Sequence, residues 1–220
     1  MIRKALLICG ILSSLLYAVM NIFIAMQWES YSSAAQTVSE LSAIGAPTRP
    51  VWVAWSVVYT LLFIAFGWSV RMSAYQNRHL HITGTTIFLY GIISVAWPFA
   101  PMHLRGEAFA LTDAMHIALG IVTIILMLII FGFGASAFGK MFRRYTIGSI
   151  LVFLVFGTLT GLASPRIAEN LPTPWIGVWE RINIGVFLLW VVVLAIILLR
   201  RNVPSAEAMI FHHGGTETRR

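Results

Sequence analysis

The sequence predicts an all-α polytopic membrane protein with six transmembrane helices and both termini in the cytoplasm. Three observations support this: an apolar composition, six long uncharged stretches, and an uneven distribution of basic residues around them. Hydrophobic residues make up 59% of the 220-residue chain and charged residues 10%, whereas a soluble domain is roughly half apolar and about a quarter charged. The composition therefore excludes a soluble enzyme, a nucleic-acid binder and a disordered chain. The single cysteine excludes a disulfide scaffold.

Six stretches without Asp, Glu, Lys or Arg are long enough to span a bilayer. A helix rises about 1.5 Å per residue and the hydrocarbon core is about 30 Å thick, so about 20 residues suffice. Together these stretches form one membrane domain, residues 1–199, and the polar residues 200–220 are expected to be a disordered cytoplasmic tail. The expected spans are 5–28, 51–70, 82–102, 114–139, 145–164 and 182–199.

The first span, 5–28, follows Met-Ile-Arg-Lys and begins like a signal peptide. A signal-peptide core is usually about 7–15 residues long and ends at a small-x-small cleavage site. This stretch is longer and has no convincing site of that kind. We therefore expect it to remain as the first helix.

Basic residues mark the ends of the second and fourth spans. The second, 51–70, is followed at once by Arg71, and the fourth, 114–139, by Lys140. The third, 82–102, is the uncharged stretch between them. Each is expected to form one membrane-crossing helix.

The fifth span, 145–164, contains a GxxxG segment, and the sixth, 182–199, ends before two arginines. Small residues let two helix backbones approach closely. Gly157 and Gly161 therefore predict either a homodimer contact or a contact with another helix of the same chain.

Basic residues are concentrated on one side of the predicted membrane. With the N-terminus inside, 11 of the 15 Lys and Arg residues lie in inner segments, and six of the eight acids lie in outer loops. This bias favours cytoplasmic termini. The protein is expected in the cell (inner) membrane as a multi-pass protein, with membrane lipids as partners and no nucleic acid.

The first outer loop carries two candidate catalytic residues. Thr37 and Glu40 have the spacing of a capping box, in which each side chain satisfies a free backbone N–H. A short helix is expected here. Ser39 and Glu40 either cap and solvate it or point inward over the helix bundle as catalytic groups.

The second outer loop suggests a metal site. Asp113 and His116 are three residues apart, so they share one face of a helix. With His103 as a third ligand they are candidates to bind zinc. Alternatively, Asp113 orients His116 as a catalytic general base, or Asp113 is only a helix cap.

The third outer loop ends in Glu180, Arg181 and Asn183. A carboxylate suits a helix N-terminus, whereas an arginine there is unfavourable and needs a partner. Glu40 and Asp113 are the candidate partners. The alternatives are a structural ion pair and an anchor for a lipid headgroup or substrate, with Asn183 as a further binding residue because polar groups at that depth often mark sites.

These segments together resemble domain-of-unknown-function family 998, polytopic proteins of bacteria and archaea. The resemblance implies a six-helix membrane fold over nearly the whole chain and assigns no reaction. The matching pieces are Val38-Ser39-Glu40-Leu41 with Gly45 and Pro47, Pro101 through Asp113-x-x-His116, and Glu180-Arg181-Ile182.

Three functions remain open from the sequence. The first is an outward-facing lipid-modifying or lipid-binding protein, in which Arg181 holds a phosphate and zinc activates water. The second is a transporter of lipids or small molecules, which the scarcity of deep ionisable residues disfavours. The third is a scaffold or accessory subunit without chemistry.

Overall fold

The computed structural model describes residues 1–201 and contains no β-strand within them. Six helices are long and apolar enough to cross a membrane, which confirms the predicted all-α polytopic fold. They are α1 (Ile2–Ala25), α2 (Arg49–Met72), α3 (Arg78–Ser94), α4 (Leu111–Ala137), α5 (Lys140–Ala163) and α7 (Ile176–Arg201). The short elements η1 (Ser39–Ser42), η2 (Trp97–Phe99) and α6 (Pro165–Ala168) lie between them. Of the predicted tail, residues 200–220, Arg200 and Arg201 belong to α7, and residues 202–220 lie outside the described residues.

Each long helix begins two to six residues before the uncharged stretch that predicted it. Charged residues occupy the first turns of these helices except α7, whose first charged residue is Glu180. Long side chains at a membrane edge extend their polar ends toward water. The third helix also ends early, at Ser94 rather than at residue 102. Pro98 and Pro101 follow, and proline disfavours helical conformation in the residue before it. The chain therefore continues as η2 and a loop.

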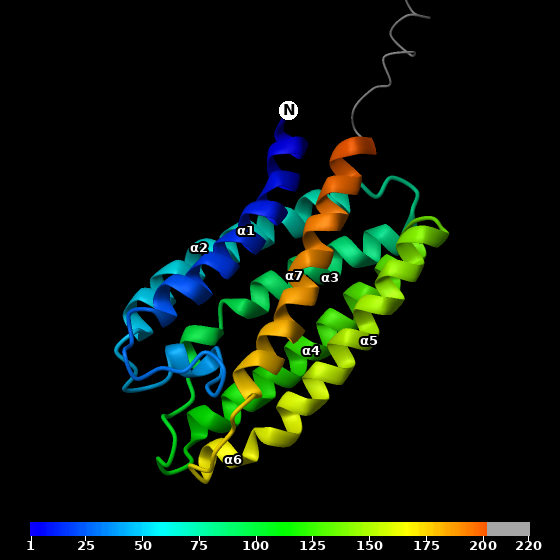
Figure 1. Cartoon of the computed structure of the whole chain (residues 1–220). Coiled ribbons are helices and arrows are strands. Elements are labelled where there is room, and N and C mark those ends of the chain that lie inside the picture. Colours follow the sequence, from blue (N-terminus) through cyan, green and yellow to red (C-terminus); the bar gives the residue numbers. More distant parts are fainter. Residues whose placement is uncertain (202–220) are drawn as a thin grey trace, which may run out of the picture.

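The six long helices form a closed ring in chain order. Each packs against the next, and α7 packs against α1 to close the ring. In Figure 1 the N-terminus and the end of α7 lie at one end of the bundle, and the longer connections lie at the other. We call these connections the cap: residues 26–48, 95–110 and 164–175.

Aromatic side chains fill the centre of the ring. Phe63, Phe131, Phe187 and Trp190 are all fully buried. The ring centroids of Phe131 and Phe187 are 5.6 Å apart, and those of Phe131 and Trp190 are 5.4 Å apart. The Trp190 Nε1–H donates to Thr146 Oγ1 at 2.9 Å, which satisfies its one polar group. The middle of the bundle is therefore tightly packed.

Two glycines let α2 and α3 come into backbone contact. A Cβ added at Gly67 would lie 2.4 Å from Phe88 N, and one added at Gly84 would lie 2.3 Å from Arg71 N. Both obstacles are backbone atoms, which cannot turn aside as a side chain can. The close packing of these two helices therefore requires glycine.

Gly67→Leu is expected to separate α2 from α3 and to lower the free energy of unfolding by about 3 kcal/mol or more, the upper range for overpacking. Thermal unfolding in detergent measures this loss. Gly120→Leu is the matched control, because a Cβ at Gly120 meets nothing within 4 Å. Equal melting temperatures for the two variants would contradict the close α2–α3 contact.

Candidate functional site

The centre of the cap is an ion pair between the first and second loops. Glu40 is fully buried, and its two carboxylate oxygens accept from Arg105 Nε at 2.6 Å and Nη2 at 3.0 Å. Arg105 also donates to Thr173 Oγ1 at 2.7 Å and to Ala35 O at 2.8 Å. One arginine thus joins all three segments of the cap.

Glu40 also completes the predicted capping box. Its Oε2 accepts from the backbone N–H of Thr37 at 2.7 Å, and its own N–H donates to Thr37 Oγ1 at 3.3 Å. The expected short helix is present as the 3-10 helix η1. With every oxygen occupied and no exposed surface, Glu40 holds the loop together and is not available to a substrate in this conformation.

His103 and Asp113 form a second, separate pair. Asp113 Oδ2 lies 2.7 Å from His103 Nδ1 and accepts from Ala110 N at 2.9 Å, while Oδ1 accepts from His103 N at 2.8 Å. Asp113 therefore caps the start of α4 and fixes the loop before it. The neighbouring strand-like contact, Ile44 N to Met102 O at 2.8 Å, links this loop to the first one.

His116 does not join this pair. Its Nδ1 lies 2.8 Å from the carbonyl oxygen of Ala100, so the ring N–H donates there, and its ring packs edge-on against Trp97 at 5.0 Å. Residues 1–201 contain no group of three His, Cys, Asp or Glu side chains placed to hold a metal ion. The structure thus brings together two of the three proposed zinc ligands and turns the third elsewhere.

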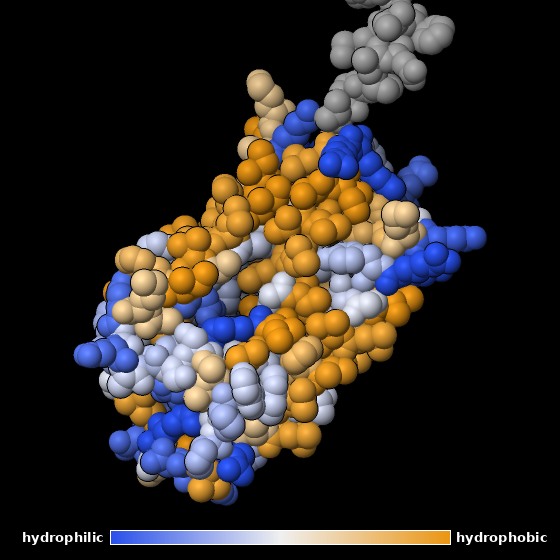
Figure 2. Space-filling model, viewed as in Figure 1, coloured by the Kyte–Doolittle hydropathy of each residue, from blue (hydrophilic) through white to orange (hydrophobic). Residues whose placement is uncertain are grey.

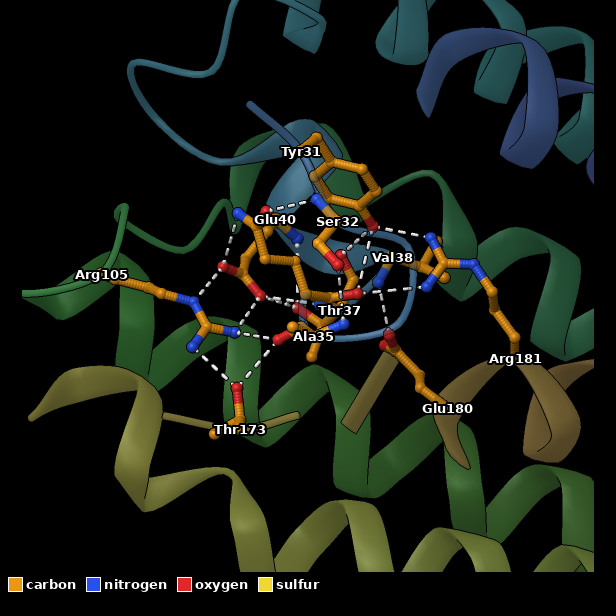
Figure 3. Close-up of polar contacts among 11 residues, drawn as sticks. Tyr31, Ser32, Ala35, Thr37, Val38, Glu40, Arg105, Thr173, Glu180 and Arg181 are labelled. Carbon is orange, nitrogen blue, oxygen red and sulfur yellow. Dashed lines mark hydrogen bonds and ion pairs between the residues drawn. The ribbon is translucent and has the colours of Figure 1, made fainter. Parts of the chain in front are cut away.

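Arg181 lies on the opposite side of the first loop from Arg105, as Figure 3 shows. Its Nε donates to Asn21 Oδ1 at 3.0 Å, and its Nη2 donates to Tyr31 Oη at 2.6 Å. Its Nη1 lies within 3.1 Å of three backbone carbonyl oxygens, those of Ser33, Gln36 and Gly177. The guanidinium is therefore held rigidly by neutral acceptors.

Arg181 forms no direct ion pair with a carboxylate among the described residues, although it interacts electrostatically with the nearby Glu180 carboxyl. The two proposed partners, Glu40 and Asp113, bind Arg105 and His103 instead, so both proposed pairings are wrong. Burial raises the pKa of Tyr31 to about 12, so its hydroxyl stays protonated and adds no negative charge. A partly buried cation without a directly paired counter-charge is costly in an apolar setting.

The two neighbours of Arg181 turn away from it. Glu180 accepts from the backbone N–H of Val38 and from Ser39 Oγ, which ties α7 to η1. Asn183 Nδ2 donates to Phe153 O at 2.6 Å. Of these three predicted binding residues, only Arg181 lines the cavity between α1 and α7.

Asn183 also explains the GxxxG segment in part. A Cβ added at Gly157 would lie 2.9 Å from Asn183 Nδ2, whereas one added at Gly161 meets nothing within 4 Å. Gly157 therefore serves the contact between α5 and α7 within the chain. A homodimer through Gly157 and Gly161 stays a prediction.

The cavity beside Arg181 is a groove of about 590 Å³ between α1 and α7. Its end near the cap is polar and is lined by Asn21, Trp28, Glu29, Tyr31, Ser33 and Arg181. Farther from the cap its lining is apolar and includes Tyr17, Ala18, Ile184, Gly185 and Leu188. Figure 2 shows a recessed hydrophilic patch between α1 and α7 within the surrounding apolar surface.

Small residues and one interhelical bond shape the groove. A Cβ added at Gly185 would meet nothing within 4 Å, so the missing side chain leaves open space. Deeper in the bundle, Ser14 Oγ donates to Leu188 O at 3.2 Å and joins α1 to α7. The groove is thus open toward the membrane and closed toward the centre of the ring.

Arg105 and Asn21 are parts of the cap and the groove that the sequence did not predict. Arg105 was recognisable in the sequence, because it is one of only four basic residues in the predicted outer loops, which carry most of the acids. Asn21 is a polar residue inside an apolar span, which was also visible. The partners of Arg105 and Asn21 come from distant segments of the chain, so the pairings were not visible in the sequence.

Comparison with known proteins identifies a family and no function. A family model described as "Protein of unknown function (DUF998)" matches residues 11–197. No curated protein matches the chain. No solved structure matches it either.

Proposed function

The chain belongs to the DUF998 family of multi-pass membrane proteins of unknown function, and we propose that it binds a membrane lipid whose headgroup carries a phosphate or carboxylate. The lipid would occupy the groove between α1 and α7, with its headgroup at Arg181. The observation that carries this proposal is a fixed guanidinium, without an ion-pair partner, at the polar end of an otherwise apolar, laterally open groove.

The depth of Arg181 suits a lipid headgroup. Arg181 is five residues from the start of α7, which is about 8 Å along the helix at 1.5 Å per residue. An anion there would pair with the guanidinium near the membrane interface, and basic pockets between transmembrane helices bind headgroups in this way. The apolar remainder of the groove, including Gly185 and Leu188, would receive an acyl chain.

We infer from the charge distribution that the cap and this headgroup site face outward. The end of the bundle opposite the cap carries most of the basic residues, and basic loops stay in the cytoplasm. The lipid would therefore come from the outer leaflet of the cell membrane.

The alternatives have less support. Transport through the bundle needs a path along its axis, and aromatic side chains occupy that position. Hydrolysis needs a reactive pair beside the bound lipid, and neither His103 nor Asp113 lines the groove. A scaffold role leaves the unpaired guanidinium of Arg181 in the wall of a groove unexplained.

Gly185→Leu is expected to fill the apolar part of the groove and to weaken retention of phosphatidylglycerol at least about 10-fold. The leucine adds four carbon atoms, about four methylenes' worth of volume, where an acyl chain would lie, and each CH₂ of that chain contributes about 0.8 kcal/mol. Native mass spectrometry of the purified protein, titrated with phosphatidylglycerol, measures the loss.

Gly161→Leu is the matched control for this experiment. It places the same side chain on another membrane-facing helix, where a Cβ also meets nothing within 4 Å. Unchanged melting temperatures with lipid lost only in Gly185→Leu would support the proposal. Equal lipid retention in both variants would refute it.

A further inference from the structure

A second charged group lies at the polar end of the groove. Glu29 lines the same cavity as Arg181. Its side chain is exposed, and it forms no ion pair with any described residue. The groove thus presents one cation fixed in its wall and one acid that is free to meet a ligand.

Aromatic rings lie beside these two charges. The rings of Trp28 and Tyr31 are 5.5 Å apart, and both residues line the groove. The guanidinium of Arg181 already covers the Tyr31 ring at 5.7 Å. Trp28, next to Glu29 in the chain, offers a second aromatic surface, and an ammonium group is attracted to such a surface.

We propose that the groove selects a zwitterionic headgroup, one that carries both a phosphate and an amine, over a purely anionic one. This inference rests on the proposed lipid-binding function. The phosphate would bind Arg181, and the ammonium group would bind Glu29 and the face of Trp28. The headgroup class is therefore that of phosphatidylethanolamine.

Charge balance gives the selection its direction. With Arg181 positive and Glu29 negative, the polar end of the groove is close to neutral, and it matches a headgroup with one charge of each sign. A headgroup with only a negative charge satisfies Arg181 and is repelled by Glu29. Removing the Glu29 carboxylate should weaken binding of the zwitterionic headgroup and strengthen binding of the purely anionic one.

The test compares two lipids on three proteins. Native mass spectrometry gives the dissociation constants of phosphatidylethanolamine and phosphatidylglycerol for the unaltered protein, for Glu29→Gln and for Glu169→Gln. Glu169 is an exposed acid in the cap that does not line the groove, so its variant has the same change in net charge. Both variants alter an exposed side chain and are expected to fold normally.

The unaltered protein and Glu169→Gln should bind phosphatidylethanolamine about 5- to 10-fold more tightly than phosphatidylglycerol, and Glu29→Gln should abolish or reverse that preference. An equal ratio in all three proteins would overturn the selection while leaving the lipid site intact. If Gly185→Leu has no effect on either lipid, the binding function itself fails, and this inference fails with it.

Discussion

Glu40→Ala is expected to lower the free energy of unfolding by about 3–5 kcal/mol, the usual cost of removing one partner of a buried ion pair. Arg105 would keep its charge and lose both carboxylate contacts. Thr37 would also lose its acceptor, so the capping box would open. Thermal unfolding in detergent and proteolysis of the cap loops measure the effect.

Glu107→Ala is the control for this prediction. Glu107 lies in the same loop as Arg105, is exposed, and forms no ion pair with a described residue. Its removal should change stability by less than about 0.5 kcal/mol. A melting temperature for Glu40→Ala equal to that of Glu107→Ala would show that the pair does not hold the cap.

Arg181→Gln is expected to weaken phospholipid binding about 10- to 100-fold. A hydrogen bond to a charged group contributes about 1.5–3 kcal/mol, and each 1.4 kcal/mol is tenfold in affinity. Glutamine removes the charge that the headgroup would neutralise. Lipid titration by native mass spectrometry, with phosphatidylethanolamine as the probe, measures the change.

Arg181 also holds the first cap loop through Ser33 and Gln36, so Arg181→Gln removes contacts of the fold as well as the charge. Two further variants separate the effect on binding from the effect on folding. Arg181→Lys keeps the charge and should retain part of the affinity, although a lysine cannot copy the forked contacts. Arg166→Gln makes the same charge change at a cap residue outside the groove. Full lipid binding by folded Arg181→Gln would contradict the role of Arg181.

The fold was predictable because the bilayer imposes a strong local constraint. Every span needs about 20 apolar residues, and that requirement is visible in any one segment, such as 114–139. The ends of spans were less predictable. The predicted spans ended at charged residues, whereas helices such as α7 continue through Glu180 and Arg181 toward the interface.

The sequence predicted which residues belong to the site better than it predicted which of them contact one another. Thr37 and Glu40 are three residues apart, and that local spacing gave the capping box correctly. The partner of Glu40 is 65 residues away along the chain. Two arginines, Arg105 and Arg181, were available, and only the packing of the loops decides between them.

The groove was invisible in the sequence for the same reason. It forms where the first and last helices meet, so its lining combines residues about 160 positions apart, such as Asn21 and Arg181. Gly185 gave no distinct signal, because an isolated glycine in a membrane helix is common. Asn21 and Gly185 become parts of one groove only where α1 and α7 pack together.

The most direct test is a density map of the protein in nanodiscs that contain phosphatidylethanolamine and phosphatidylglycerol. The lipid-binding account predicts elongated density in the groove between α1 and α7. Its head should lie within hydrogen-bonding distance of Arg181, and its tail should run past Gly185 toward Leu188. A groove without lipid density, in which the Glu29 carboxylate turns inward and pairs with Arg181, would contradict the account.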